Sequence, residues 1–537
     1  MRVIINQKYK WHCSEGEGIK LWWIGSRDAA RKLFLCCSEN PTASMAIVER
    51  ALCDLRGNYS AILEQKNRVI AAVDRIRSFP VFYSHGKERF LVSNSARDIR
   101  RVKGLHEVDP LSLLEFRMAG YVTGGETLYR NLHQLQAGEF LIWEGEGNRL
   151  KKDRYYLFHS GKVRNEREED LIEELDDVTD RIFSRVADAA AGAPIWVPLS
   201  GGLDSRLVLC KLKQLGYSNL TAFSYGPPGN HEARAARYVA AKVGVPWVFL
   251  VSKRKSAIRF FNSRTRRLHW EFADGLCSLP FYQDIQTLWE NKEDRVIPED
   301  AIIINGNSGD FITGGHVPRL DGKTHSLRVD DLLTALVDKH FSLRSSLKVP
   351  GNVERIKGKI LDSLKLESSG EMSLQDLAKH WERWEWQERQ SKFVVNGQRN
   401  YDFFGFSWKL PLWDDEYLYF WNEIPVHLKL NQELYKRYLF KKDFFGLFRS
   451  FPFRIWRWPG ASIAVVPAAR AVKVLFGGKA SDRVYRVFSY WGHYRDSYAY
   501  NGYWHFLKNC FDIKNPNSLF VDRWLQEEGL RNENSFH

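Results

Sequence analysis

The sequence predicts a protein of mixed α/β and α+β class, in which a domain of antiparallel strands precedes a domain built on a parallel sheet. Three observations lead to this prediction. Short apolar runs between polar turns fill residues 1–155, strands and helices alternate between residues 194 and 315, and residues 330–445 are mostly helical and rich in Trp and Phe. At 537 residues and 44% hydrophobic composition, the chain is long enough for two or three globular domains.

The amino-acid composition limits the classes of molecule that the protein is expected to bind. A formal charge of +14 favours anions such as nucleotides, sugar phosphates, nucleic acid or an acidic membrane surface. The basic residues are scattered without a run of five or six, so we expect no nucleic-acid partner. Seven cysteines without a CxxC pair suggest neither disulfides nor zinc and suit the cytoplasm. We also expect neither a signal peptide nor a membrane-spanning helix, and homo-oligomerisation is left open.

In the first domain, apolar and β-branched runs at 57–64, 68–74, 80–83 and 89–93 predict adjacent antiparallel strands. The best helix candidate there is 42–55. The second domain is expected to open with a helix over 165–191, where apolar residues recur at helical spacing. Strands at 195–199, 220–225, 248–251 and 301–304 then alternate with helices at 205–215 and 232–243. Such alternation implies parallel strands joined by crossover helices.

The most informative segment is VPLSGGLDSR, residues 197–206. Consecutive glycines after a strand let backbone N–H groups converge on one point without a Cβ in the way. The hydroxyls of Ser200 and Ser205, with the N-terminus of the following helix, can hold an anion there. Asp204 beside that anion would be repulsive unless a cation such as Mg²⁺ lay between them. The plain alternative is a glycine turn that only caps the helix.

This loop resembles the pyrophosphate-binding loop of the ATP pyrophosphatases and differs from a Walker loop, which needs a Lys-Ser/Thr pair. A second segment, INGNSGD at 304–310 followed by Gly314 and Gly315, resembles the S-G-E-G-S-D-E-x-x-G-G loop of asparagine synthetases. The resemblance implies ATP and Mg²⁺ as cofactors, with Asp204 and Asp310 as catalytic metal ligands. It also implies a set of nucleotide-binding residues: Pro198, Leu199, Ser200, Gly201, Gly202, Ser205, Tyr225, Asn305 and Gly306.

Two further segments extend the resemblance to the asparagine synthetase family over residues 170–450. WKLPLWD at 408–414 is similar to the R-x-P-F-L-D segment, and QELYKRYL at 432–439 is similar to the K-x-x-L-R helix whose lysine faces pyrophosphate. Lys436 takes that catalytic role on this match, with Lys441 as its nearest competitor. One departure is Asn307, which replaces the acidic residue of S-G-E-G. A neutral amide cannot act as a general base, which puts the second reaction step in doubt.

Residues 1–155 resemble the class II glutamine amidotransferase domain, an Ntn-hydrolase-like β-sandwich, at RGNYSAIL (56–63) and AVDRIRSFPVFY (72–83). Active members of that class carry cysteine at position 2, which provides the nucleophile beside a free α-amino group. This chain has Arg2, and Cys13 lies too far along to replace it. We therefore expect a structural domain without glutaminase activity. Nitrogen would come from dissolved ammonia, a separate glutaminase or an amine on the substrate.

The resemblance implies an ATP-dependent ligase that adenylates a carboxylate, releases pyrophosphate and passes the acyl group to nitrogen. Thiolation chemistry of related pyrophosphatase-loop enzymes is one alternative, and its members usually lack the glutaminase-like domain. The other is a nucleotide-binding pseudoenzyme or scaffold partner of an amidotransferase, favoured by Asn307 and Arg2 and opposed by the two retained carboxylates.

The substrate is suggested by WEWQERQSKFVVNGQR at 384–399 and YDFFG at 401–405, which look like a family branch associated with bacterial surface-polysaccharide biosynthesis. A uronic acid or its nucleotide-linked form is then the expected carboxylate. Arg389, Lys392, Asn396 and Arg399 recur at helical spacing and could contact a carboxylate or sugar phosphate. A solvated basic face explains them equally well.

Residues 451–537 form a basic, aromatic C-terminal extension. Around an apolar core, the stretch 453–476 combines Trp456, Trp458 and Phe476 with four basic residues, Arg454, Arg457, Arg470 and Lys473. Such a mixture can rest in an anionic membrane interface. We expect instead that the extension packs across the synthetase-like domain as a lid or support.

Overall fold

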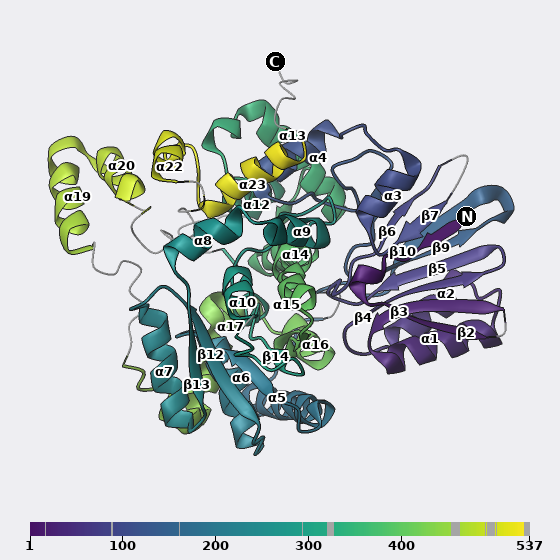
Figure 1. The fold of residues 1–537 in the computed structure, drawn as a ribbon, viewed down its shortest axis with the longest axis horizontal. Coiled ribbons are helices and arrows are strands. Elements are labelled where there is room, and N and C mark those ends of the chain that lie inside the picture. The colour runs from purple at the N-terminus through teal and green to yellow at the C-terminus, as the bar shows by residue number, and fades with distance from the viewer. Residues whose placement is uncertain are drawn as a thin grey trace.

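A computed structural model describes residues 1–16, 18–86, 90–159, 162–292, 294–318, 327–452, 462–488, 490, 500 and 502–530, with backbone alone for 462–466 and 479 (Figure 1). The N-terminal domain lies at the right of the view and the parallel sheet at the lower left. The helices between them, α14 (Leu374–Glu385) and α15 (Arg399–Phe404), join the two parts.

The N-terminal domain contains two sheets. The six-stranded sheet is antiparallel and has the order β10-β9-β5-β4-β3-β2, built from Arg149–Arg154, Glu139–Glu144, Arg68–Val73, Tyr59–Gln65, Ile19–Gly25 and His12–Gly16. The four-stranded sheet has the order β1-β7-β6-β8, built from Arg2–Ile4, Leu91–Ser93, Phe82–Ser84 and His133–Gln134. Only the β1–β7 pair in it is parallel. The expected antiparallel strands are confirmed.

Alternation along the strands explains why both faces of the larger sheet are covered. Ile62, Val69 and Ala71 point into a core shared with the smaller sheet, whereas Leu63 and Ile70 belong to the core on the opposite face. That opposite core includes apolar residues of α1 (Arg27–Glu39) and α2 (Met45–Cys53). Helix α2 matches the predicted helix at 42–55, and α1 is an additional helix. The result is a β-sandwich with helices outside it.

The second domain is built on a five-stranded parallel sheet of order β13-β12-β11-β14-β17, formed by Trp247–Val251, Leu220–Gly226, Ile195–Pro198, Ile302–Ile304 and Ser407–Lys409. The crossover helices include α6 (Leu203–Gln214), α7 (His231–Val243) and α10 (Ile285–Lys292), and α5 (Glu168–Ala190) precedes the first strand. All four predicted strands are present, and β17 was not predicted. Strand order reverses at β11 and β14, and ligands of open α/β sheets bind at such a point.

Helices occupy most of residues 329–442, as the sequence predicted. They include α12 (Val329–His340), α13 (Pro350–Leu364), α16 (Asp415–Asn422), α17 (Val426–Lys429) and α18 (Glu433–Lys442). Between α14 and α15 the chain forms a π-helix, Trp386–Val394, and a 3₁₀ turn, Val395–Gln398. Trp381, Trp384 and Trp386 are fully buried here, which accounts for the clustering of tryptophan in this segment.

The C-terminal extension has two parts that differ in how they pack against the rest of the protein. Helix α23 (Pro516–Glu527) packs on α4 (Pro110–Ala119), where the rings of Trp524 and Phe116 lie 4.7 Å apart in a shared core. Helices α19 (Ser462–Phe476) and α20 (Gly478–Phe488) pack on each other and project beside α8 (Arg254–Phe261) and α22 (Tyr503–Asn509) (Figure 1). Residues 453–461, with Arg454, Trp456, Arg457 and Trp458, lie outside the described residues. Helix α23 packs on the N-terminal domain through α4 and on the second domain through the ion pair of Arg266 and Glu527, so it supports both domains and not the synthetase-like domain alone.

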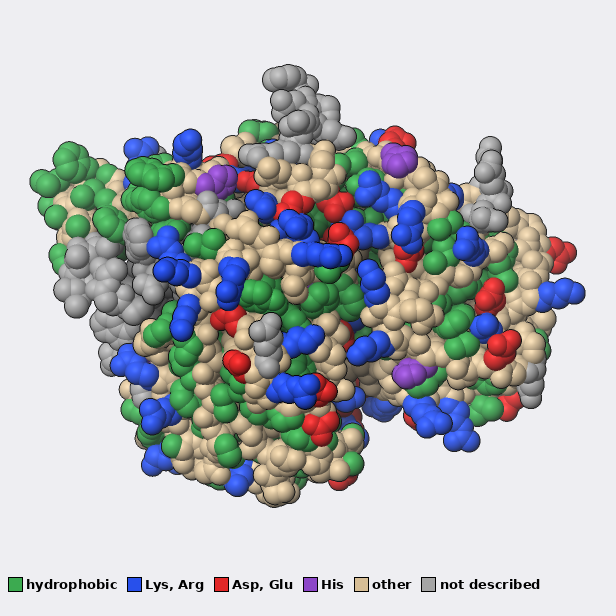
Figure 2. All heavy atoms as spheres, in the orientation of Figure 1, with side chains coloured by type: hydrophobic (Ala, Val, Ile, Leu, Met, Phe, Trp, Pro, Cys, Tyr) green, Lys and Arg blue, Asp and Glu red, His purple; other side chains and the backbone are tan. Residues whose placement is uncertain are grey.

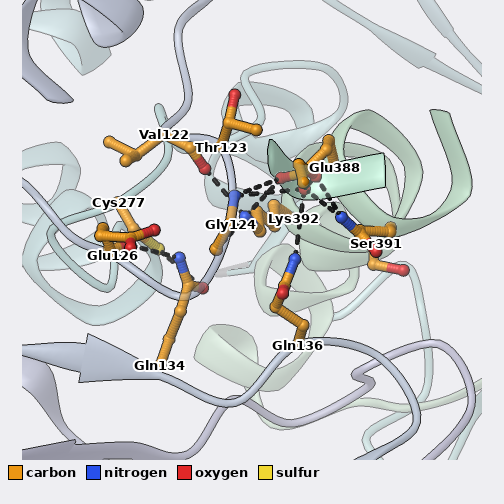
Figure 3. Close-up of polar contacts among 12 residues, drawn as sticks. Val122, Thr123, Gly124, Glu126, Gln134, Gln136, Cys277, Glu388, Ser391 and Lys392 are labelled. Carbon is orange, nitrogen blue, oxygen red and sulfur yellow. Dashed lines mark hydrogen bonds and ion pairs between the residues drawn. The ribbon is translucent and has the colours of Figure 1, made fainter. Parts of the chain in front are cut away.

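A buried ion pair joins the two domains (Figure 3). Lys392 Nζ donates to the carbonyls of Val122 at 2.8 Å and Gly124 at 2.6 Å, and lies 2.5 Å from Glu388 Oε2. Glu388 also accepts hydrogen bonds from the Gly124 N–H and from Gln136 Nε2. Both charged side chains are fully buried. Since these contacts connect the π-helix to the loop 122–136, the network fixes the two domains against each other.

We expect Lys392→Met to lower the free energy of unfolding by about 3–5 kcal/mol, because Glu388 would then be buried without its cation. Denaturant unfolding at neutral pH measures this loss. The double variant Lys392→Met/Glu388→Met should recover part of it, since no unpaired charge remains. The control is Lys441→Met, which removes an exposed partner of Glu173 and should cost less than about 1 kcal/mol. Equal losses for Lys392→Met and the control would contradict the role of the ion pair.

Candidate active site

A cavity of about 490 Å³ lies outside the carboxyl ends of β11, β12 and β14, at the point where strand order reverses. Its lining brings together ten of the predicted site residues from three separate segments: Pro198, Leu199, Ser200, Gly202, Asp204, Ser205, Tyr225, Asn305, Gly306 and Asp310. Gly201 and Lys436 are not part of the lining. The distant motifs of the sequence therefore meet in one place.

The first loop connects β11 to the N-terminus of α6. Ser205 Oγ accepts from the Ser200 N–H at 3.1 Å and lies 3.1 Å from Ser200 Oγ, which accepts from the Gly202 N–H. The two hydroxyls thus hold the loop closed across the first turn of the helix. Gly201 is buried against Ala235 of α7 and positions the loop from behind. The arrangement presents hydroxyls and a helix N-terminus to the cavity, which suits an anionic group.

The second loop follows β14 and approaches the first loop closely enough to require glycine. A Cβ on Gly306 would lie 3.0 Å from the Asp204 carbonyl carbon and the Ser205 nitrogen, and one on Gly309 would lie 2.5 Å from Asp204 Cγ. Any side chain at either position would therefore push the loops apart. Between them, Ser308 adopts a left-handed φ of 68°, and its hydroxyl donates to Gln390 Oε1 at 2.8 Å.

The two acidic residues meet at this contact. The Asp310 N–H donates to Asp204 Oδ2 at 3.0 Å, and Tyr435 of α18 donates to Asp204 Oδ1 at 2.9 Å. Burial, and then the charge of Asp310, raises the pKa of Asp204 to about 7. A divalent cation between the carboxylates would remove this repulsion. No group of three or more His, Cys, Asp or Glu in the described chain could hold a metal, so Mg²⁺ would need oxygens of a bound phosphate as further ligands.

Asp310 is the end of a chain of charges, centred on the buried Glu385, that the sequence did not reveal. His316 contacts Asp310 Oδ2 through Nε2 at 3.1 Å and Glu385 Oε1 through Nδ1 at 2.5 Å. Glu385 also accepts from Lys339 Nζ at 3.1 Å. Burial lowers the pKa of His316, but the charges and hydrogen bonds of Glu385 and Asp310 raise it to about 9. His316 is therefore an imidazolium at neutral pH, and it holds Asp310 in place.

A third carboxylate, Asp284, lines the same cavity and was not predicted. Its oxygens accept from Tyr401 OH and from Asn400 Nδ2, both at 2.6 Å. Tyr401 in turn accepts from Asn305 Nδ2 at 3.5 Å, which connects Asp284 to the second loop. Burial raises the pKa of Asp284 to about 7. Asp284 has a φ of 58° and belongs to no recognisable motif, so only the fold could reveal it.

The proposed basic face of residues 389–399 is wrong for three of its four members. Lys392 is bound in the domain junction, Asn396 donates to the Ala273 carbonyl, and Arg399 pairs with Asp402. All three are buried, so they are neither substrate contacts nor a solvated surface. The cause is the π-helix and 3₁₀ turn, which break the α-helical spacing on which the prediction relied. Arg389 alone stays partly exposed, 3.9 Å from Glu385.

Lys436 lies on α18, one residue after Tyr435, and its side chain leaves the cavity. Its Nζ donates to the Asn431 carbonyl at 2.6 Å. The competing Lys441 pairs with Glu173 on α5 at 2.8 Å. The structure brings neither lysine to the two carboxylates, and the catalytic role of Lys436 stays a prediction. Asn307, the departure from the family pattern, does line the cavity.

The loops that line this cavity lie in a part of the chain that matches a known family model. Residues 184–442 match the family model of asparagine synthase, and this part of the chain belongs to the asparagine synthetase family. The match contains both acidic loops and α18.

Two solved structures are weakly similar. One is glutamine phosphoribosylpyrophosphate amidotransferase from B. subtilis in complex with ADP and GMP, with 13% identity over 55% of this chain and 57% of that one, and a TM-score of 0.16. The other is the allosteric regulatory enzyme of purine biosynthesis, with 11% identity over 54% and 55%, and a TM-score of 0.18. This chain thus spans little more than half of each, and scores this low carry no structural or functional inference. The search of curated proteins gave no match.

We expect Tyr435→Phe to weaken Mg²⁺-ATP binding about tenfold, because Asp204 would lose the hydroxyl that orients it. Isothermal titration calorimetry measures this. Tyr417→Phe is the matched control: its phenol is equally buried, but its hydroxyl does not donate to Asp204. If both variants bind Mg²⁺-ATP like the unaltered protein, Tyr435 does not position Asp204.

Proposed function

We propose that this protein transfers AMP from ATP to a substrate carboxylate, releases pyrophosphate, and forms an amide by attack of nitrogen on the acyl-adenylate. The observation that carries the proposal is the meeting of Asp204 and Asp310 beside the N-terminus of α6 in one cavity. Two converging carboxylates suit a cation on a polyphosphate, and the hydroxyls of the first loop suit the phosphate itself.

Each group has a definite task in this reaction. Ser200, Ser205 and the N–H groups at the start of α6 would bind pyrophosphate and orient it as the leaving group. Asp204 and Asp310 would hold Mg²⁺, which supplies neutralisation of the charge on the departing phosphates. Tyr435 and His316 keep these carboxylates in position. Lys436 would add positive charge only if its side chain turned from the Asn431 carbonyl toward the cavity.

The nitrogen source is proposed to lie outside the N-terminal domain. Arg2 stands where active members of the class carry their nucleophile, and none of the domain's four cysteines, Cys13, Cys36, Cys37 and Cys53, lies at that position. The nitrogen would be dissolved ammonia, ammonia from a separate glutaminase, or an amine of the substrate. The domain itself would serve as the support that holds the π-helix.

The carboxylate is proposed to be a uronic acid or its nucleotide-linked form, in a cytoplasmic step of surface-polysaccharide synthesis. Arg389 is the one member of the proposed basic face with an exposed part, and it lies near the acidic loop. It could pair with the substrate carboxylate. Asp284 could accept hydrogen bonds from hydroxyl groups at the same cavity.

A nucleotide-binding scaffold is the alternative function. Asn307 is neutral where the family has an acid, and Lys436 points away from the cavity. A protein of this kind would bind Mg²⁺-ATP without cleaving it. Both carboxylates are retained together with the buried groups that orient them, which favours the enzyme.

We expect ATP–pyrophosphate exchange that depends on Mg²⁺ and on the right carboxylate, with AMP and no ADP formed. A screen over uronic acids, their nucleotide-linked forms and other acids would find the substrate, because exchange reports adenylation without the nitrogen donor. Asp204→Asn and Asp310→Asn should each reduce exchange about a hundredfold or more, whereas exposed Asp177→Asn should not. Formation of ADP would overturn the assignment, and tight ATP binding without exchange on any acid would favour the scaffold.

We also expect no hydrolysis of glutamine to glutamate by the purified protein. Once the carboxylate is known, ammonium salts or an amine should support amide formation and glutamine should not. Glutamate release that persists in Cys13→Ala would contradict this, since that variant lacks the exposed thiol nearest the N-terminus.

A further inference from the structure

The α19–α20 hairpin carries hydrophobic side chains that are far more exposed than those of the two domains. Val474 is 85% exposed, Leu475 71% and Phe476 73%. Outside the C-terminal extension, no large hydrophobic side chain of the described chain exceeds 47%, the value for Val349. Single exposed apolar residues are ordinary on protein surfaces, but three consecutive ones at this exposure form a patch.

The three residues lie at the outer end of the hairpin. They form the last turn of α19, Gly477 turns the chain with a φ of 83°, and α20 begins at Gly478. Ala469 and Ser481 are buried where the two helices pack against each other. The hydrophobic residues Val474–Phe476 stay exposed at the outer end of the hairpin, which we call the apex. Figure 2 shows hydrophobic side chains gathered on this projection at the left end of the molecule. The patch is therefore convex, and it is not the floor of a groove.

Positive charge surrounds the apex. Residues 467–488 contain five basic residues and a single acidic one, Asp482. Arg470 and Lys473 precede the apex on α19, and Arg483 and Arg486 follow it on α20. All four are exposed at least in part. An apolar tip with basic flanks matches the interface of a bilayer that contains anionic lipid, where apolar groups enter the acyl boundary and cations meet headgroups.

We propose that the apex Val474–Phe476 inserts into the surface of an anionic membrane and that the flanking basic residues bind the lipid headgroups. The attachment would be peripheral, because no helix among the described residues is long and apolar enough to cross a bilayer. A small apolar tip gives modest affinity, and the electrostatic part weakens as salt screens the charges.

The hairpin is connected to the wall of the cavity, which gives membrane binding a consequence for the site. Tyr490, just after α20, accepts from Arg254 on α8 at 2.9 Å. Further along the same segment, Tyr500 lines the cavity and donates to Gln286 at 2.9 Å. A docked apex would hold the cavity close to the membrane, where a lipid-linked substrate would be within reach. The membrane binding itself does not depend on which reaction the cavity performs.

The test is flotation of the full-length protein with phosphatidylcholine vesicles that contain or lack phosphatidylglycerol. We expect binding to the anionic vesicles at low salt and little binding to neutral vesicles. In 0.5 M NaCl the binding should be at least tenfold weaker, because the Debye length is then short and the charges are screened. Leu475→Asp/Phe476→Asp should reduce binding at least tenfold. The matched control, Ile47→Asp/Val349→Asp, places the same charges at exposed apolar sites elsewhere and should float like the unaltered protein.

Circular dichroism and Mg²⁺-ATP binding would establish that both double variants are folded. The proposal is overturned if the unaltered protein binds no vesicles, or if the apex variant floats as well as the control. It is also overturned if the unaltered protein is a dimer and the apex variant a monomer, because a second copy would then cover the patch.

Discussion

The buried pair of Lys392 and Glu388 is the interaction on which the rest of the structure depends. Two charges removed from water are tolerated because carbonyls, an amide and a backbone N–H from the loop 122–136 complete their hydrogen bonding. The pair lies on the π-helix, two residues from Gln390, which accepts the Ser308 hydroxyl of the second acidic loop. The N-terminal domain therefore acts on the cavity through the π-helix, although it contributes none of the lining of that cavity.

The acidic loops show the cost of bringing two carboxylates together. Gly306 and Gly309 permit the approach, and the pKa of Asp204 is raised first by burial and then by the resulting repulsion. His316 relieves it on the Asp310 side. Groups that are unfavourable for the folded chain alone commonly mark functional sites, because a ligand supplies the missing partner. The cavity is therefore suited to bind a cation together with its phosphate.

The sequence predicted the parts of the site that depend on local chain geometry. The loop Ser200–Ser205 follows a strand, contains two glycines and leads into a helix, all within a few residues. Its conformation is therefore set locally, and it could be recognised without knowledge of the fold. Tyr435, His316 and Asp284 could not be found in this way, because each acquires its role from a partner that is distant in sequence or buried by tertiary packing. Helix α1 carries a local signal at its start, the capping Ser26.

The prediction of a basic face at residues 389–399 was wrong for the opposite reason. Its local pattern was clear, but the π-helix changed the period on which the pattern rested, and the exposed groups became buried contacts. Strand β17 is only three residues long and gives no periodic signal of its own. Strand alternation, in contrast, predicted the N-terminal sheets well, because both of their faces are covered by apolar layers.

Strand order in the parallel sheet has a consequence for how the chain is made. The first strand, β11, is central, whereas β17, which completes the sheet beside β14, is synthesised about a hundred residues after β14. During translation, the edge of β14 stays unpaired until β17 has been synthesised. The carbonyls of Val122 and Gly124 likewise lack their partner until Lys392 has been synthesised. Nascent chains with such unpaired edges are prone to aggregate. The order of synthesis thus makes the finished cavity one of the last features to form.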